Sequence, residues 1–264
     1  MSEPGRAGQE SKHGPAHPGI TVVMVTRNRP ALFLDAFHSV EAQTLRPLEV
    51  RVGDDGDPPL AWLPDVSRLD VTLLPVGARR AAAARNHAAA RARGEILAFL
   101  DDDDRWQPDH LLGLAAAFED PAVMFAWRDC AVIRETVQEN GDRVERARLE
   151  IARDWDPEMM RTNDYLPPSA WAVRRSLFQA LDGFDESFEF SEDWDFVLRA
   201  AKQAVPRRVP GVTVEVRLRE SGNASADFGR ERIACLEKLS ARHGLPRLVP
   251  RTFWEVAQLA AAGW

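Results

Sequence analysis

The sequence has few cysteines, a single tyrosine and no long apolar run. Its 264 residues contain two cysteines, Cys130 and Cys235, which form no C-x-x-C pair. This excludes a disulfide-built scaffold and favours a reducing compartment, with both thiols as core residues. No stretch approaches the roughly 18 to 20 apolar residues that a membrane-spanning helix needs, and the first residues lack the apolar segment of a secretory signal. We therefore expect a cytoplasmic protein without a transmembrane segment.

The chain also lacks an excess of positive charge. Its net charge is −7, which argues against nucleic acid or an anionic membrane as a general partner. The arginine-rich stretch at 79–94 has no interleaved aromatic residues, so we interpret it as the exposed face of a helix. Residues 1–18 are rich in Gly and Pro and contain no apolar cluster, and we predict a disordered tail there.

Apolar strands alternate with amphipathic helices from Ile20 onward, which predicts βαβ units and a mainly parallel sheet. Ligands of such sheets bind at the carboxyl ends of the strands. The second half of the chain is more mixed, with an antiparallel hairpin turning at Asn140-Gly141. The predicted strands are 20–26, 48–56, 70–76, 95–100, 169–173 and 212–218. The predicted helices are 31–43, 79–94 (closed by Gly94), 174–181, 191–203 and two at the C-terminus.

Four aspartates, at 101–104, directly follow the strand predicted at 95–100. Two unit charges about 4 Å apart repel by about 1 kcal/mol even in water, so four carboxylates need a counter-charge. Asp103 or Asp104 could instead cap the next helix. Mg²⁺ or Mn²⁺ would supply the counter-charge, because these ions take carboxylate and phosphate oxygens. A second acidic pair, at 54–55, also ends a predicted strand.

Five ordered blocks of the sequence resemble glycosyltransferase family 2 and together cover roughly residues 18–205. They are ITVVMVTRNRP, EAQTLRPLEVRVGDDGD, ARNHAAARARGEILAFLDDDDRWQPDHL, LDGFDESF and SEDWDFVLRAA. The resemblance implies the α/β fold called GT-A, a Rossmann-like mixed and mainly parallel sheet flanked by helices. We expect residues 19–225 to form this catalytic domain and residues 226–264 to form a helical extension packed on it.

The resemblance also implies a reaction. A sugar would pass from a nucleotide-sugar, for which we expect a UDP-sugar, to an acceptor hydroxyl, with inversion at the anomeric carbon and dependence on Mg²⁺ or Mn²⁺. The base would be Asp193, with Glu192 as the runner-up. The metal ligand would be Asp103, with Asp101 as the second aspartate of the DxD motif. The residues that the resemblance assigns to the nucleotide are Thr26, Arg27, Asn28, Asp54, Asp55, Arg85, Asp101 and Asp102.

Two positions depart from the family pattern. Arg27 stands where many members have an aromatic residue. Between Val205 and Ser225 there is no histidine to act as a further metal ligand. Two alternatives stay open: a nucleotidyltransferase acting on sugar phosphates, and a non-catalytic nucleotide- or sugar-binding module. The first would be expected to have a glycine-rich loop after the first strand, and VTRNRP has no glycine; the second would be expected to lack the intact SED motif.

The helix predicted at 191–203 has a clear apolar face, and its acidic residues lie at different angles to that face. Ser191 is its predicted N-cap, and acids in the first turn are expected there for the helix dipole alone. Asp195 projects away from the apolar face and can pair with Arg199. Asp193 flanks the apolar face, where partial desolvation would raise its pKa and make it a better base.

The acceptor cannot be identified from any motif. A carbohydrate, a glycolipid and a small molecule all remain open, and the choice is expected to depend on residues 135–168 and the C-terminal helices. We expect one or two tryptophans of the catalytic half to border the acceptor cleft, with Trp106 or Trp155 as the first candidates. The tryptophans considered are Trp62, Trp106, Trp127, Trp155, Trp171 and Trp194. The apolar residues of the segment 249–264 suggest a weak homo-oligomer or contact with a membrane edge.

Overall fold

The computed structural model describes residues 17–60, 68–77, 80–138, 143–220, 226 and 228–262. Residues 1–16, which make up most of the predicted tail, and the turn predicted at Asn140-Gly141 lie outside the described residues. The predicted parallel strands are present as β1 (Ile20–Thr26), β2 (Glu49–Asp54), β3 (Val71–Pro75) and β4 (Ile96–Asp101). They pair in the order β3-β2-β1-β4, all parallel. Every residue of β1 is buried, because its continuous β-branched run contacts neighbours on both faces of the sheet.

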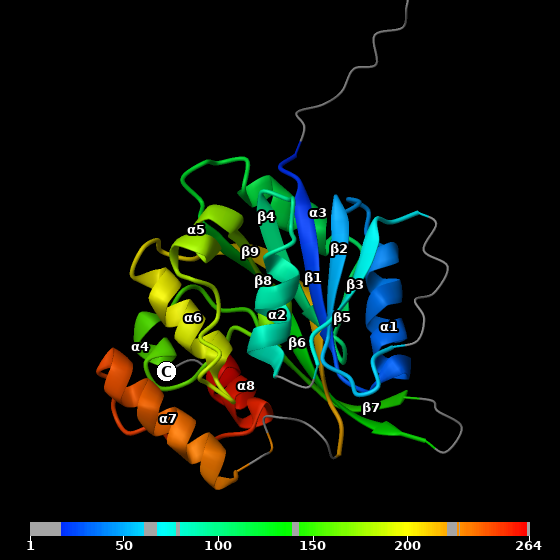
Figure 1. The fold of residues 1–264 in the computed structure, drawn as a ribbon. Helices are drawn as coiled ribbons and strands as arrows, with labels where there is room; N and C mark the ends of the chain where they lie inside the picture. The colour runs from blue at the N-terminus through cyan, green and yellow to red at the C-terminus, as the bar shows by residue number, and fades with distance from the viewer. Residues whose placement is uncertain are drawn as a thin grey trace, which may run out of the picture.

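Beyond β4 the sheet becomes mixed (Figure 1). β8 (Trp171–Arg174) pairs antiparallel with β4, and β6 (Phe125–Val137) pairs antiparallel with β8. β9 (Arg207–Leu218) runs parallel to β6, and the two-residue strand β5 (Arg105–Trp106) pairs antiparallel with β9. The predicted hairpin is confirmed as the antiparallel pair of β6 and β7 (Arg143–Ile151). The mixed α/β sheet predicted from the sequence is therefore confirmed.

Helices connect and cover these strands. The second predicted helix is shorter than expected and ends at Ala89, so Gly94 is not its C-cap. Gly94 is needed for a different reason, because a Cβ atom there would lie 2.6 Å from the backbone nitrogen of Thr21. A short helix also lies between β7 and β8, where we predicted none. The helices are α1 (Pro30–Glu41), α2 (Ala81–Ala89), α3 (His110–Ala117), α4 (Pro157–Met160), a 3₁₀ turn (Pro168–Ala170), α5 (Arg175–Ala180), α6 (Glu192–Ala201), α7 (Arg230–His243) and α8 (Phe253–Ala262).

An aromatic cluster fixes α6 against the sheet. The Trp171 ring of β8 stacks on Phe196 of α6 with centroids 5.4 Å apart, and it lies 4.8 Å from Phe99 of β4. Phe178 and Phe184 complete the cluster. Each such pair adds about 0.5–1.5 kcal/mol beyond the area that it buries. The N-terminus of α6 is thereby held close to the carboxyl end of β4.

The C-terminal helices pack onto the same body. Trp254, Val256 and Ala257 of α8 are buried, and α8 contacts β6 and β7. The Arg134 guanidinium lies 4.5 Å from the Trp254 ring centroid, a cation–π distance. Part of the apolar segment from which we expected a homo-oligomer is thus covered within the chain, while Val249 is 57% exposed. None of the described helices has the length and apolar character needed to cross a membrane.

Candidate active site

Parallel pairing brings the ends of β1, β2 and β4 together at one edge of the sheet. Thr26 is the register partner of Asp54 across β1 and β2, and Val25 is the partner of Asp101 across β1 and β4. Both acidic clusters therefore lie at the carboxyl ends of parallel strands, as predicted. A cavity of about 560 Å³ opens at this edge. The residues assigned to the nucleotide that line it are Thr26, Arg27, Asp55, Arg85, Asp101 and Asp102.

Asp102 is held by the first strand and by the turn that follows it. Thr26 Oγ1 donates a hydrogen bond of 2.8 Å to Asp102 Oδ2, and Arg29 Nη2 lies 3.0 Å from Oδ1. Burial raises the pKa of Asp102 to about 7; the charge of Asp103 adds to this, and that of Arg29 opposes it. The contacts of Asp102 therefore link β4 to the turn after β1.

Arginines neutralise the other two aspartates that line the cavity. Asp103 Oδ2 accepts hydrogen bonds from Arg29 Nη1 and Arg219 Nη2, each at 2.9 Å. Asp101 Oδ1 accepts a bond of 2.6 Å from Arg85 Nη2. The counter-charge that we expected from a cation is thus supplied, at least in part, by guanidinium groups. Charge balance alone does not require a metal ion here.

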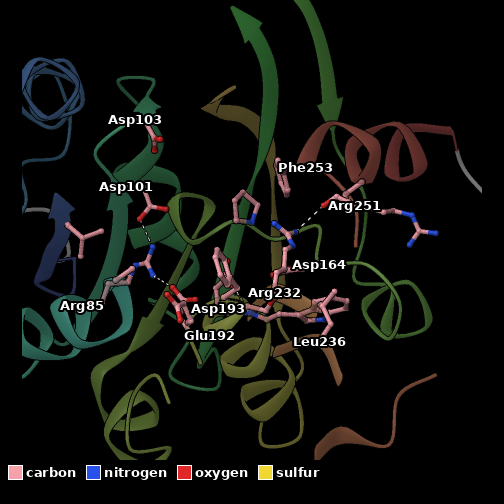
Figure 2. A pocket seen from close by; sticks show the side chains of 18 of the residues that line it. Arg85, Asp101, Asp103, Asp164, Glu192, Asp193, Arg232, Leu236, Arg251 and Phe253 are labelled. Atoms are coloured by element: carbon pink, nitrogen blue, oxygen red, sulfur yellow. Dashed lines mark hydrogen bonds and ion pairs between the residues drawn. The ribbon is translucent and has the colours of Figure 1, made fainter. Parts of the chain in front are cut away.

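Arg85 joins two parts of the site that are far apart in the sequence. Besides Asp101, its guanidinium binds Glu192 Oε1 through Nη1 at 2.6 Å. The side chain is 6% exposed. Burial opposes its charge, but Asp101 and Glu192 together raise the pKa of Arg85 above its ordinary value. Arg85 therefore connects the acidic run at the end of β4 to the start of α6, as Figure 2 shows.

Asp104 builds the fold rather than the cavity. It is buried, its Oδ2 accepts a 2.6 Å bond from Ser169 Oγ, and its Oδ1 accepts a 3.2 Å bond from the backbone nitrogen of Arg217. Neither Asp103 nor Asp104 caps the next helix, because α3 begins after Asp109.

Asp54 and Asn28 shape the loops that follow β2 and β1, and neither is among the described residues that line the cavity. The Asp54 carboxylate accepts hydrogen bonds from the backbone nitrogens of Gly56 and Leu60. Asn28, in the left-handed region at φ 55°, accepts a 3.1 Å bond from the backbone nitrogen of Asp57. Their contacts hold the two loops against each other.

Glu192 and Asp193 face the cavity from the start of α6. Burial raises the pKa of Glu192 to about 7; the charge of Asp193 adds to this, and Arg85 opposes it. Burial also raises the pKa of Asp193, again against Arg85. Asp193 Oδ1 accepts a 2.9 Å bond from the backbone nitrogen of Trp194. Both carboxyl groups thus have the raised proton affinity that a general base needs.

Two details of α6 differ from expectation. Ser191 is not a side-chain N-cap: it has φ 64° and makes no capping hydrogen bond. Asp195 does pair with Arg199, at 2.7 Å, as predicted. It is nevertheless fully buried, because Arg242 and His243 of α7 also bind it, at 3.0 and 2.8 Å. Burial raises the pKa of Asp195, but the His243 bond and the charge of Arg199 outweigh it and bring the pKa below its ordinary value.

Asp164 lines the cavity and was missed by the sequence analysis. It lies in the polar loop before β8, and its Oδ1 accepts a 3.2 Å bond from the backbone nitrogen of Leu166. Burial, followed by the charge of Asp193, raises its pKa well above the usual range. No motif surrounds Asp164, so only the folded loop could show that it lies close to Asp193.

The two tryptophans that were the first candidates for the acceptor cleft do not line this cavity. Trp106 is buried, its Nε1 donates a 2.7 Å bond to the carbonyl oxygen of Ser169, and it lies outside the described lining of the cavity, as does Trp155. Trp194, at the start of α6, lines the cavity instead, with its Nε1 bound to the carbonyl oxygen of Met160 at 2.8 Å.

The C-terminal helices, which we expected to influence the choice of acceptor, form one wall of the same cavity, although no individual residue in them could be named from the sequence. Arg232 and Leu236 project from α7. Phe253 is the first residue of α8, and Arg251 lies in the segment just before it. In Figure 2 these side chains lie beyond Glu192 and Asp193, on the side away from Asp101 and Asp103. The cavity thus has a motif-bearing end and a C-terminal end, with the two candidate bases between them.

Comparisons with known proteins bear on this arrangement. The sequence profile of glycosyl transferase family 2 matches residues 21–181. The chain belongs to glycosyltransferase family 2. A Bacillus subtilis (strain 168) protein described as the uncharacterized glycosyltransferase YwdF is 32% identical over 239 residues, which cover 89% of this chain and 87% of the relative. The family predicted from the five sequence blocks is confirmed, and the protein is a glycosyltransferase. Family membership decides against the nucleotidyltransferase and the non-catalytic alternatives.

Solved structures confirm the GT-A fold of this family 2 member. Staphylococcus aureus TarS 1-349 in complex with UDP-GlcNAc has a TM-score of 0.59 at 18% identity, covering 84% of this chain and 66% of that one. The mannosyltransferase PcManGT from Pyrobaculum calidifontis, in complex with GDP-Man and Mn²⁺, has a TM-score of 0.58 at 20% identity, covering 94% of this chain and 70% of that one. The chain therefore spans just under two thirds of the TarS fragment.

The donor atoms at the acidic run suit a hard divalent cation. Asp101 and Asp103 line the cavity with side chains 25% and 22% exposed, and both hydrogen bonds described for Asp103 use the same oxygen, Oδ2. Carboxylate oxygens are what Mg²⁺ and Mn²⁺ prefer. Within the described part of the chain, no three His, Cys, Asp or Glu side chains converge as a metal site. The residues therefore fit a cation that takes one or two protein carboxylates and completes its shell with substrate oxygens and water.

Proposed function

We propose that this glycosyltransferase moves a sugar from a nucleoside diphosphate to an acceptor hydroxyl, with a divalent cation and with inversion at the anomeric carbon. The observation that carries the proposal is the bridge made by Arg85. It holds the acidic run, which suits a nucleotide diphosphate and its cation, beside the carboxyl pair Glu192 and Asp193, which suits a base. One cavity therefore contains both sets of groups that a single displacement needs.

In the proposed reaction Asp193 takes the proton of the acceptor hydroxyl. The hydroxyl oxygen forms a bond to the anomeric carbon while the bond from that carbon to the diphosphate oxygen breaks, on the opposite face, which inverts the centre. A positioned base contributes about 10²- to 10⁴-fold to such a step. The raised pKa of Asp193 keeps its proton affinity high. Glu192 is the runner-up, because its second role is to hold Arg85.

The nucleotide is proposed to lie against the ends of β1, β2 and β4. Thr26, Arg27 and Asp55 would face the nucleobase and the ribose of the nucleotide. Asp54 and Asn28, whose side chains bind the backbone of the neighbouring loop, would act indirectly by holding the shape of this end. Arg85 is proposed to position Asp101 rather than to bind the nucleobase, since both of its terminal nitrogens already bind carboxylates.

Asp103, with Asp101, would hold the cation. When bound, a divalent cation supplies Lewis-acid stabilisation of the charge that develops on the leaving diphosphate. Arg29 and Arg219, which hold Asp103 at 2.9 Å, would orient its carboxylate. The absence of a histidine at 205–225 leaves the remaining ligand positions to water and the diphosphate. The Mn²⁺ in the mannosyltransferase complex supports the choice of a divalent cation.

Calorimetric titration of UDP and GDP, with and without Mn²⁺, tests the proposal. We expect one nucleotide to bind, with uridine as our prediction, and Mn²⁺ to tighten it. Asp103→Asn should remove the Mn²⁺ effect, whereas Asp109→Asn, an exposed aspartate just before α3, should leave it intact. Nucleotide binding that does not change with Mn²⁺ would contradict the proposed role of the cation. The absence of any nucleotide binding would contradict the proposed function.

A further inference from the structure

The C-terminal end of the cavity has a charge unlike the rest of the molecule. Residues 228–262 contain six arginine and lysine residues against three glutamates, in a chain whose net charge is −7. Two of these arginines, Arg232 and Arg251, line the cavity. An acidic protein has thus placed guanidinium groups at one end of its active-site cleft.

Arg251 links Arg232 to the loop before β8 through hydrogen bonds. Arg251 Nη1 donates a 3.1 Å bond to Asn163 Oδ1, and Arg232 Nη2 donates a 3.0 Å bond to the carbonyl oxygen of Arg251. Among the described residues Arg251 makes no ion pair within 4.0 Å, whereas the arginines at the other end, such as Arg29 and Arg85, bind carboxylates directly. Hydrogen bonds from Thr252, and then the charge of Arg251, lower the pKa of Glu255, but the Arg251 and Glu255 side chains form no direct ion pair. The Arg251 guanidinium can therefore bind a ligand, and arginine binds phosphate and carboxylate in the same bidentate way.

The acids of the cavity limit where an anion can bind. Asp164, Glu192 and Asp193 lie together in its centre, and each repels another closely enough to raise a pKa. A substrate anion near them would be repelled in the same way. A hydroxyl, by contrast, can donate to these carboxylates. The centre therefore favours a hydroxyl and the C-terminal end favours an anion (Figure 2).

We propose that the C-terminal end of the cavity is the acceptor subsite and that it selects an acceptor carrying a phosphate or carboxylate group. The anion would bind Arg251 and Arg232, and the acceptor hydroxyl would point toward Asp193. Phe253 offers an apolar ring at the same end for the face of the acceptor sugar. This inference rests on the proposed function, because it takes Asp193 as the base and the acidic run as the donor end.

Binding of simple sugars tests the subsite. Glucose, glucose 6-phosphate, glucuronate and inorganic phosphate are titrated by ligand-observed NMR, with Mg²⁺ and whichever of UDP and GDP binds. We expect the two anionic sugars to bind about 10- to 100-fold more tightly than glucose, as hydrogen bonds to charged groups predict. Comparing them shows whether phosphate or carboxylate is preferred.

Arg251→Gln and Arg232→Gln should each remove most of this preference while leaving nucleotide affinity unchanged. Arg247→Gln removes the same charge from an exposed position of the same segment, outside the described lining of the cavity, and should change nothing. Two results would overturn the inference: equal affinity for glucose and the anionic sugars, or equal losses in Arg247→Gln and Arg251→Gln. Inorganic phosphate binding as tightly as glucose 6-phosphate would indicate an adventitious ion only. If no nucleotide binds, the proposed function fails instead.

Discussion

The two ends of the cavity are built in different ways. At the proposed donor end, polar residues follow directly from strands β1, β2 and β4, and the parallel register sets their positions. At the proposed acceptor end, the walls come from the loop around Asp164 and from α7 and α8, which are far apart in sequence and meet only after folding. The residues of a site built on sheet register can be named from the sequence, whereas for a site built on helix docking only the contributing segments could be named.

The largest expected effect is that of Asp193→Asn, which tests whether the reaction takes place between the two ends of the cavity. Asp193→Asn keeps the size of the side chain but removes the base. We expect turnover, measured as release of nucleoside diphosphate from the donor, to fall by about 10²- to 10⁴-fold. Nucleotide affinity should not change, because the donor end is left intact.

Glu192→Gln is the comparison for Asp193→Asn. It removes the runner-up base and also weakens the hold on Arg85, so nucleotide affinity should fall together with turnover. Near-normal turnover in Asp193→Asn, with a large loss in Glu192→Gln, would exchange the two roles.

The second prediction tests the bridge between the β4 end and α6. Arg85→Met leaves Asp101 and Glu192 facing the cavity without their shared cation. Removing one partner of a buried ion pair costs about 3–5 kcal/mol, and because Asp101 is 25% exposed we expect the lower end, about 3 kcal/mol of the free energy of unfolding. Urea denaturation measures this value.

Arg91→Met is the matched control for the Arg85 variant. Arg91 is exposed just beyond α2, and its Nη1 binds only the backbone oxygen of His87 among the hydrogen bonds described for it. Its loss should change stability by less than about 0.5 kcal/mol. Equal losses in the two variants would mean that the bridge contributes nothing specific.

Much of the fold followed from patterns along the chain. The continuous apolar run at Ile20 identified a strand buried on both faces, and the alternation of strands and helices gave the parallel half of the sheet. Helix ends were less predictable. Serine is a residue type favoured at N-caps, yet the backbone of Ser191 is left-handed and its hydroxyl makes no capping bond. Glycine is a residue type favoured just after a helix, yet Gly94 is required because the backbone of Thr21 leaves no room for a Cβ atom there.

The candidate site divides in the same way. Asp101, Asp103 and Arg85 could be named because they follow strands or belong to family blocks. The partners that hold them could not, since Arg219 meets Asp103 only through the position of β9 beside β6 and β5. Asp195 was predicted to pair with Arg199, but its burial under α7 depends on tertiary packing.

The third prediction is that stability and activity depend on pH in opposite directions, because of the raised pKa of Glu192. The pKa of Glu192 is about 7 in the folded protein and about 4.5 when unfolded. Between these values the folded state binds a proton that the unfolded state does not. The resulting stabilisation is therefore fully present below pH about 4.5 and is lost as the pH rises through about 7. Activity should change in the opposite direction, because the carboxyl groups must be ionised.

Urea unfolding across this range, in the wild type and in Glu192→Gln, measures the effect. The free-energy difference between the two proteins should change by about 1–3 kcal/mol. Glu237→Gln, an exposed glutamate of α7, should leave the pH dependence unchanged. The same slope in all three proteins would contradict the raised pKa of Glu192.

The smallest expected effect tests whether the acceptor end can open by itself. His243 of α7 binds Asp195 of α6 at 2.8 Å and is 2% exposed. His243→Ala leaves Asp195 with Arg199 and Arg242, so we expect a local loss of about 1–2 kcal/mol.

Hydrogen exchange would locate that loss. Protection of the α7 amides should fall in His243→Ala while β1 and β4 keep theirs, because locally docked elements open below the global free energy of unfolding. His38→Ala, at an exposed position of α1, is the control. If protection falls equally in β1 and α7, the two ends of the cavity unfold as one unit, and the acceptor wall is as firmly built as the sheet. A loss confined to α7 would instead mean that the subsite depends on a few polar contacts made by one docked helix, which sequence variation could alter without disturbing the donor end.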